Sequence, residues 1–417
     1  MPSRPGNHVG DDLGRRSARR GWRVVTAAFV VMFATFGCAY SFSAFFSPLQ
    51  ASFGASRGAL SWVLSIAISL FFIIGAASGP IADRIGARAM ALSGSLIVGL
   101  GLFVAAQAQA LWQVYLGFGL GIGVGVGISY VPSVGAVQRW FVRQRGLASG
   151  IAVAGIGAGT LCMPKIAEWL IDAYGWRGAY LLLGSFAVLA GGVAALFIDA
   201  SPQQHGFLPD GGVAASGASV VHRGEGAALR DAIRSRQFQL FYGANFCASL
   251  GLFLPFVHLA PFAEDRGISH ATAVSLFTLV GVGSTFGRFL LGGLADRMGR
   301  RRSFAGMYLG MALMLVWWLN SWSAWQIAVF ALVFGTCYGG FVALAPALIV
   351  DYFGERNASG LIGLSYTAVA LGTLAGSPFA GYVFDFFQSY TMPIAVSAAA
   401  MFVSFVLICL APEPAKP

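Results

Sequence analysis

The sequence predicts an all-α integral membrane protein, with twelve transmembrane helices in two six-helix halves related by pseudo-symmetry. Three observations predict this fold class: a very apolar composition, twelve long apolar runs, and one loop motif that occurs twice, half a chain apart. Of the 417 residues, 57% are hydrophobic and only 10% are charged. Because a soluble domain carries roughly 25% charged residues, this composition excludes a water-soluble protein.

The twelve apolar runs are the candidate membrane spans. A helix needs about 20 mostly apolar residues to cross a hydrocarbon core of ~30 Å. In the first half, the expected spans are 24–46, 62–81, 90–108, 112–136, 148–170 and 179–198. In the second half, they are 239–262, 274–294, 304–319, 324–350, 360–384 and 392–411. Several runs are rich in glycine, as expected of membrane helices, because small residues let two backbones approach closely.

The distribution of the cations predicts the orientation. The two chain ends and the loops on their side carry 21 of the 26 Lys and Arg residues, whereas the opposite loops carry only Arg57, Lys165, Arg177 and Arg266. The positive-inside rule therefore predicts both termini in the cytoplasm, and we expect a multi-pass protein of the cell (inner) membrane. The cations are scattered through short loops without interleaved aromatic residues, which excludes nucleic-acid binding.

The same pattern divides the chain into segments. We expect a disordered cytoplasmic N-terminus at 1–21, helix bundles at 22–198 and 238–411, a cytoplasmic linker at 199–237 and a tail at 412–417. Residues 227–238 form either a short amphipathic helix on the membrane surface or an extension of the seventh span. The five cysteines lie far apart inside apolar runs, so they are packing residues rather than a disulfide or metal set, and we expect no cofactor.

A charged loop motif follows both the second and the eighth expected span. The pattern G-x-x-x-D-R-x-G-x-R occupies residues 79–88 and again residues 292–301, which is 213 positions later. Two parallel halves with a substrate site between them near mid-membrane are a known transporter plan. The alternative is that the charged residues only cap and pair at helix ends. The residues that we expect to gate the conformational change are Asp83, Arg84, Asp296 and Arg297.

The doubled motif resembles the signature of the major facilitator superfamily, with Ala87 in place of a basic residue in the first copy. Segments 140–150 with 154–155, 174–178, 45–46 and 61–62 resemble the monocarboxylate transporter family, and we expect a bacterial-type member. One departure is that Arg20 stands where that family has an acidic residue before Gly21. The resemblance implies a major facilitator fold and a secondary transporter rather than an enzyme.

Arg288 is a charge inside an apolar span. It precedes Asp296 by eight residues, so it lies about 12 Å from the helix end, close to the middle of the membrane. An Arg there costs ~2.5–3.5 kcal/mol even on the lenient insertion scale, so it must face a partner or a cavity. Its planar fork fits a carboxylate with two hydrogen bonds. We expect a substrate carboxylate as partner, and the resemblance supports this role; the alternative is a structural Arg bonded to backbone carbonyls.

Polar residues at similar depth are candidate companions of Arg288. Tyr338 and Arg288 each lie 14 residues into their spans. Both spans start on the same side of the membrane, opposite the motif loops, so the two residues have the same depth. The resemblance favours Tyr40 and Tyr338, because the family lines its cavity at matching places. The further candidates for the substrate site are Tyr130, Asn245 and Ser284. A tyrosine in a span is otherwise a packing residue.

Coupling to protons needs a titratable group near the site. Asp265 and His258 both lie near the end of the seventh span. His has an unperturbed pKa near 6.5, and prokaryotic members of the resembled family use an acidic residue at the place of Asp265. The alternative for both is simple solvation at a helix end.

These observations predict proton-coupled symport of one small monocarboxylate, such as lactate or pyruvate, by alternating access. The single cation Arg288 matches a single carboxylate, whereas an oxalate–formate type anion exchanger is expected to hold a second cation in the eleventh span. A proton-driven efflux pump is less favoured, because 155–164 lacks the Gly-Pro pattern typical of such pumps. The expected partners are the substrate, a proton and the lipid bilayer, and we expect a monomeric functional unit.

Overall fold

The computed structural model describes residues 7–141, 144–208, 229–354 and 358–412. The described chain is helical, which confirms the prediction of an all-α membrane fold. The first half contains α1 (Asn7–Tyr40), α2 (Phe42–Phe53), α3 (Arg57–Ile85), α4 (Ala87–Ala106), α5 (Leu111–Val114), η1 (Tyr115–Leu120), α6 (Gly121–Trp140), α7 (Arg145–Phe186), η2 (Ala187–Gly191) and α8 (Gly192–Ala195). The second half contains α9 (Leu229–Arg234), α10 (Arg236–Leu252), α11 (Leu254–Glu264), α12 (His270–Met298), α13 (Arg300–Leu319), α14 (Ala324–Phe353), α15 (Ala358–Phe387) and α16 (Thr391–Leu410). A short η3 (Pro202–His205) follows α8.

The helices have the length and composition of membrane spans. Among the described residues, ten helical stretches are long and apolar enough to cross a membrane. Gly175 has non-helical backbone angles (φ 70°, ψ 167°) inside α7 and divides it into two arms. All twelve expected ranges overlap helices, while the exact number of twelve spans stays a prediction.

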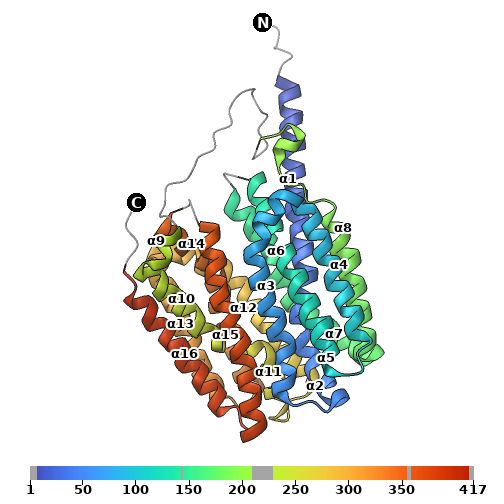
Figure 1. Ribbon diagram of the computed structural model, residues 1–417, viewed down its shortest axis with the longest axis vertical. Helices are drawn as coiled ribbons and strands as arrows, with labels where there is room; N and C mark the ends of the chain where they lie inside the picture. Colours follow the sequence, from blue (N-terminus) through green and yellow to red (C-terminus); the bar gives the residue numbers. More distant parts are fainter. Residues whose placement is uncertain (1–6, 142–143, 209–228, 355–357, 413–417) are drawn as a thin grey trace.

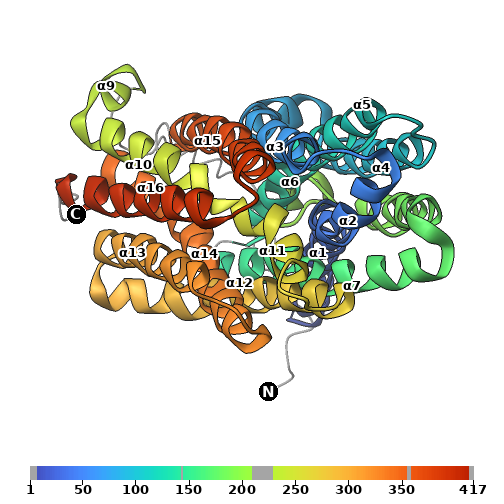
Figure 2. The same cartoon turned by 90° about the horizontal axis from the view of Figure 1, so that it is seen from below.

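The two halves stand side by side, and α1 begins at the same end of the bundle at which α16 ends (Figures 1 and 2). We call this end the termini side and the opposite end the far side. The halves meet where α3 packs along α15 and where α7 packs along α12. Glycines allow close crossings within each half; for example, a Cβ added to Gly101 of α4 would lie 2.5 Å from the carbonyl oxygen of Gly117.

The sequence repeat is also a repeat of backbone structure. Gly86 ends α3 with φ 97° and ψ 141°, and its N–H donates to the carbonyl of Ala82. Gly299, which is 213 residues later, ends α12 with φ 90° and ψ 129°, and its N–H donates to the carbonyl of Ala295. Such positive φ values favour glycine, because a Cβ would clash with the neighbouring backbone. The repeated glycine therefore makes the same sharp turn in both halves.

Two segments differ from or refine the expectations. The helix α1 begins at Asn7, so residues 7–21 are helical where we expected disorder. The reason is that Gly21 packs close to Phe141 and Arg20 forms an ion pair with Asp199, and a helix that is already nucleated extends at little cost. Within 229–238, α9 is a separate short helix and α10 begins at Arg236, because Ser235 caps α10 by accepting a hydrogen bond from the N–H of Phe238 at 3.2 Å. The place of α9 on the membrane surface stays a prediction.

Candidate substrate-binding site

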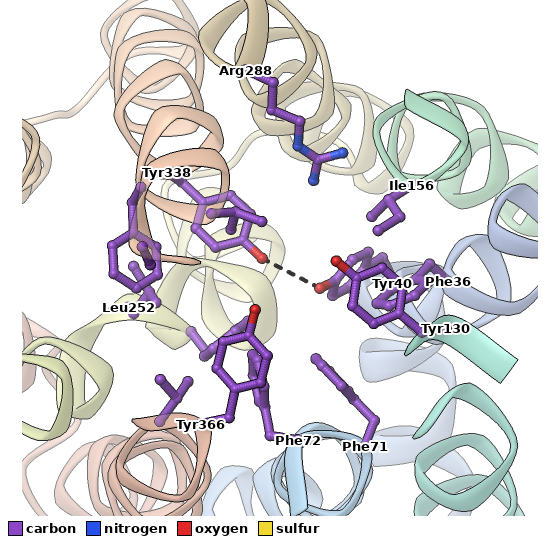
Figure 3. Close-up of a pocket in the computed structure, with 15 residues that line it drawn as sticks. Phe36, Tyr40, Phe71, Phe72, Tyr130, Ile156, Leu252, Arg288, Tyr338 and Tyr366 are labelled. Atoms are coloured by element: carbon purple, nitrogen blue, oxygen red, sulfur yellow. Dashed lines mark hydrogen bonds between the residues drawn. The ribbon is translucent and has the colours of Figure 1, made fainter. Parts of the chain in front are cut away.

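A cavity lies between the two halves, at the middle of the bundle. Its wall combines one arginine with four tyrosines and a surround of Phe and aliphatic side chains (Figure 3). The lining residues are Phe36, Tyr40, Phe71, Phe72, Tyr130 and Ile156 from the first half and Leu252, Phe253, Arg288, Tyr338, Phe341, Val342, Ala345, Tyr366 and Val369 from the second. Both halves thus line this cavity.

Arg288 extends from α12 toward the centre of this cavity (Figure 3). Its Nη1 donates to the carbonyl oxygen of Val153 on α7 at 2.8 Å, which links the two halves. Its Nε is buried and has no hydrogen-bond partner among the described residues. A guanidinium has five N–H donors, so one backbone carbonyl satisfies only part of its capacity. Arg288 therefore has features of both interpretations. It donates to a backbone carbonyl, as a structural Arg would, and it still offers N–H donors to the cavity, as a substrate-binding Arg would.

Three predicted tyrosines, Tyr40, Tyr130 and Tyr338, line the same cavity. The hydroxyls of Tyr40 and Tyr338 meet across the two halves at 3.4 Å. The free volume of the cavity is about 40 Å³, far below the roughly 300–1,000 Å³ of typical ligand pockets. The cavity is therefore nearly closed by its own aromatic side chains.

Tyr366 of α15 is a fourth tyrosine in the wall, which the sequence analysis missed; its hydroxyl points into the cavity (Figure 3). Phe36 lies one helical turn from Tyr40 and packs edge-on against Tyr130, with ring centroids 5.4 Å apart. Depth along the eleventh span could have singled out Tyr366, but the direction of its side chain could not be read from an apolar sequence.

Two predicted companions, Asn245 and Ser284, do not line this cavity in the structure, and their role at the site stays a prediction. Asn245 is buried within the second half, where its Nδ2 donates to the carbonyl of Phe241 at 2.8 Å and its Oδ1 accepts from Tyr308 at 3.3 Å. Ser284 is buried at the crossing of α12 and α14, where its backbone lies directly against Gly339. Both residues have the predicted depth, but their helices turn them away from the cavity.

Asp265 belongs to a polar network that joins the halves at the far side, and we call this network the far-side lock: Arg57, Asp265, Asp385, Tyr390 and His258. Arg57, at the start of α3, donates to both carboxylate oxygens of Asp265 at 2.6 Å. The Asp385 carboxylate accepts from the backbone N–H of Arg57 at 2.9 Å and from that of Gly58 at 2.8 Å. The guanidinium of Arg57 also donates to the Tyr390 hydroxyl at 2.8 Å.

His258 is the fully buried member of this lock. Its Nδ1 lies 3.1 Å from the Tyr390 hydroxyl, and its Nε2 lies 3.1 Å from the carbonyl oxygen of Ser377 and 3.0 Å from Ser61 Oγ. Because a carbonyl only accepts, we assign the proton to Nε2, and Tyr390 then donates to Nδ1. This assignment satisfies both ring nitrogens with a neutral imidazole.

The motif residues lie at the termini side. Arg84 and Arg297 are exposed at the ends of α3 and α12, and the side chains of Asp83 and Asp296 lie outside the described part of the chain. Arg88, the last residue of the first motif, forms an ion pair with Asp199, and Arg20 binds the same carboxylate at 3.0 Å. Arg20, which departs from the resembled family's acidic residue, is thus paired within the first half.

A bundle of two repeated helical halves with a central cavity between them is the architecture of a membrane transporter. Residues 27–243 and 241–417 both match the Major Facilitator Superfamily. The chain therefore belongs to the major facilitator superfamily, which makes it a membrane transporter rather than an enzyme. Several of its relatives are named monocarboxylate transporters.

Three relatives and one solved structure illustrate this similarity. The chain is 29% identical to Monocarboxylate transporter 11 of Homo sapiens over 390 residues, which cover 91% of this chain and 80% of that protein. It is 26% identical to Monocarboxylate transporter 13 of Bos taurus over 395 residues (94% and 89%) and 28% identical to the MFS-type transporter pynF of Aspergillus niger over 372 residues (88% and 82%). A crystal structure of a bacterial homologue of the human lysosomal transporter Spinster, inward-facing and unoccupied, matches with a TM-score of 0.65 at 15% identity, covering 94% of this chain and 95% of that one. This last likeness supports the fold alone.

Proposed function

We propose that the protein carries one small monocarboxylate together with a proton, by alternating access, with the substrate carboxylate bound to Arg288. The observation that carries the proposal is the guanidinium in the central cavity, which has a buried Nε without a partner among the described residues. An unsatisfied buried donor costs free energy, and a carboxylate would satisfy Nε and Nη2 as a bidentate pair. Hydroxyls of Tyr40, Tyr130 and Tyr338 are available to the rest of the substrate.

The charge of the cavity supports a single carboxylate. Arg288 is the one ionised side chain among its fifteen lining residues. A monocarboxylate would neutralise this charge, whereas a dicarboxylate would leave a second anion in an aromatic wall without a cation. Carrying a buried, unpaired charge through the membrane is costly, so the charge balance favours a monocarboxylate over an oxalate-type substrate.

The far-side lock supports a proton-coupling role for Asp265 and His258. The side chain of Asp265 is 33% exposed, so protons can reach it from the far side. Protonation of Asp265 would remove the charge that holds Arg57 and so weaken the link between the halves. A proton added at Nδ1 of His258 would displace the hydrogen bond that Tyr390 donates and place a second cation near Arg57. Either event favours opening of the far side.

The proposal also covers the orientation of the protein in the membrane and the size of its functional unit. The excess of cations on the termini side supports cytoplasmic termini in the cell (inner) membrane, so that the far side faces outward. The motif residues Asp83, Arg84, Asp296 and Arg297 would then gate the cytoplasmic side. We also propose a monomeric functional unit, because the two halves of one chain enclose the cavity between them.

Uptake of radiolabelled L-lactate and pyruvate into proteoliposomes, with an inward proton gradient, tests this function. We expect gradient-dependent uptake by the unmodified protein. In Arg288→Ala, kcat/KM should fall at least about 100-fold, because two charge-assisted hydrogen bonds of about 1.5–3 kcal/mol each are lost. Arg288→Lys keeps the charge but not the fork, so uptake should recover only in part. Arg236→Ala, on an exposed residue outside the cavity, is the matched control and should retain uptake.

The alternatives give different results in the same assay. Uptake that requires an internal anion and ignores the proton gradient would indicate an exchanger. Extrusion of lipophilic compounds without carboxylate uptake would indicate an efflux pump. Full uptake by Arg288→Ala would overturn the role of Arg288 in either case.

A further inference from the structure

We propose that a groove on the lipid-facing surface between α1 and α8 binds an anionic phospholipid in the leaflet of the termini side. The groove has a volume of about 830 Å³ and lies apart from the central cavity. Its lining residues are Ala18, Arg19, Trp22, Arg23, Thr26, Ala27, Val30, Ala194 and Phe197. We call it the α1–α8 groove. The inference depends on the membrane location of the chain and is independent of the proposed substrate.

The arginines at this end of α1 differ in whether they form an ion pair within the protein. Arg20 turns inward and pairs with Asp199. Arg19 and Arg23 line the groove and are exposed, and within the described ranges neither forms a hydrogen bond or an ion pair. They are four residues apart on one helix, so their side chains lie next to each other on one face. The groove therefore presents two adjacent positive charges that the protein itself does not neutralise.

The remainder of the groove is apolar. Ala27, Val30 and Phe197 also line it, and Phe197 is 57% exposed. Val30 lies about 16 Å along the helix from Arg19, which is a distance from the headgroup region into the hydrocarbon core. Trp22 lies between the two arginines and packs on Phe141, with ring centroids 5.2 Å apart. A cationic rim above an apolar floor fits a molecule with an anionic head and an acyl chain.

This chemistry selects a phospholipid over a free anion, and an anionic over a zwitterionic lipid. A free phosphate would use the two arginines but leave the apolar floor uncovered, whereas a lipid covers both. In a zwitterionic lipid the amine offsets the phosphate, so the headgroup brings no net negative charge to the two arginines. Phosphatidylglycerol brings one net negative charge, and cardiolipin brings two and therefore matches both arginines.

Native mass spectrometry of the full-length protein in detergent tests the inference, with phosphatidylglycerol as the titrated lipid. Each basic residue at an anionic membrane surface contributes about a fivefold change in binding. We therefore expect Arg19→Gln with Arg23→Gln to weaken binding of one phosphatidylglycerol about 25-fold. Phosphatidylethanolamine should bind the unmodified protein more weakly than phosphatidylglycerol, and inorganic phosphate at millimolar concentration should not displace the bound lipid.

Two further variants separate the groove from general positive charge. Arg234→Gln with Arg236→Gln removes two exposed cations from α9 and α10 in the other half and should leave tight binding unchanged. Thr26→Trp keeps both arginines but fills the groove, because Thr26 is exposed in its wall, and it should weaken binding about tenfold or more. Equal loss in both arginine pairs, equal binding of the two lipids, displacement by phosphate, or unchanged binding in Thr26→Trp would each overturn the proposal.

Discussion

Replacing Asp265 by Asn should loosen the far-side lock and shift the protein toward a conformation that is open at the far side. In the structure, Arg57 forms two hydrogen bonds of 2.6 Å to the Asp265 carboxylate. Asn is nearly isosteric with Asp but neutral, and it can accept at only one atom. The substitution therefore removes one of the two hydrogen bonds and leaves the other with a neutral acceptor, while the backbone is unchanged.

The size of the effect follows from how far the pair is buried. The side chain of Arg57 is 13% exposed and that of Asp265 is 33% exposed. A buried hydrogen bond to a charged group contributes about 1.5–3 kcal/mol, and an exposed ion pair contributes about 0.2–1 kcal/mol. For this half-buried pair we expect a loss of about 1.5 kcal/mol, which corresponds to about a tenfold shift in the conformational equilibrium.

Hydrogen–deuterium exchange of the first turns of α3, in protein reconstituted into nanodiscs, measures this opening. The N–H groups of Arg57 and Gly58 are held by Asp385, so they exchange when the lock opens. We expect about tenfold faster exchange in Asp265→Asn. The control is Asp172→Asn, which removes an exposed carboxylate from α7 and should leave exchange unchanged. Unchanged exchange in Asp265→Asn, or an equal rise in both variants, would refute the reasoning.

Three further predictions follow from the same structure. Tyr338→Phe should raise KM for the carried acid about 3–10-fold through loss of one hydroxyl contact. Tyr308→Phe, outside the cavity, is the control and should leave KM unchanged. Equal effects of the two variants in uptake assays would contradict the role of Tyr338 in substrate binding. Asn245→Ala should lower the free energy of unfolding by about 1–3 kcal/mol, because it leaves buried partners unsatisfied, while KM stays the same; a rise in KM without loss of thermal stability would restore Asn245 to the site. Gly299→Ala should destabilise the protein by about 1–3 kcal/mol, because its φ of 90° is strained for alanine. Gly306→Ala, within α13, is the control. Equal melting temperatures of the two variants would contradict the requirement for glycine at the turn between α12 and α13.

The sequence predicted what depends on position along the chain. Arg288 was singled out as a charge inside an apolar span, Tyr338 and Tyr130 by their depth, and Tyr40 and Tyr338 also by the family resemblance. All four line one cavity. The repeated motif likewise predicted a charged loop at the same place in both halves, and the structure has equivalent glycine turns there, at Gly86 and Gly299. Depth is readable because a membrane helix has a nearly fixed rise per residue and a defined entry and exit.

The sequence did not predict what depends on rotation about a helix axis or on distant partners. Asn245 has the right depth but faces Tyr308, since a helix that is apolar on most faces gives no period from which to read its orientation. The lock brings together Arg57 and Asp265, which are 208 residues apart, and Arg57 and Tyr390, which are 333 apart. Such pairs arise only from the packing of the two halves.

The contact between the hydroxyls of Tyr40 and Tyr338 has a thermodynamic consequence for any molecule that the protein carries. A ligand needs more room than about 40 Å³, so it binds only the fraction of molecules in which the two tyrosines have moved apart. The apparent affinity is then the intrinsic affinity reduced by that fraction. By the same linkage, each ligand that binds raises the population of the separated form. Substrate occupancy and the spacing of the two halves are thus one equilibrium, and a mutation at this contact changes both together.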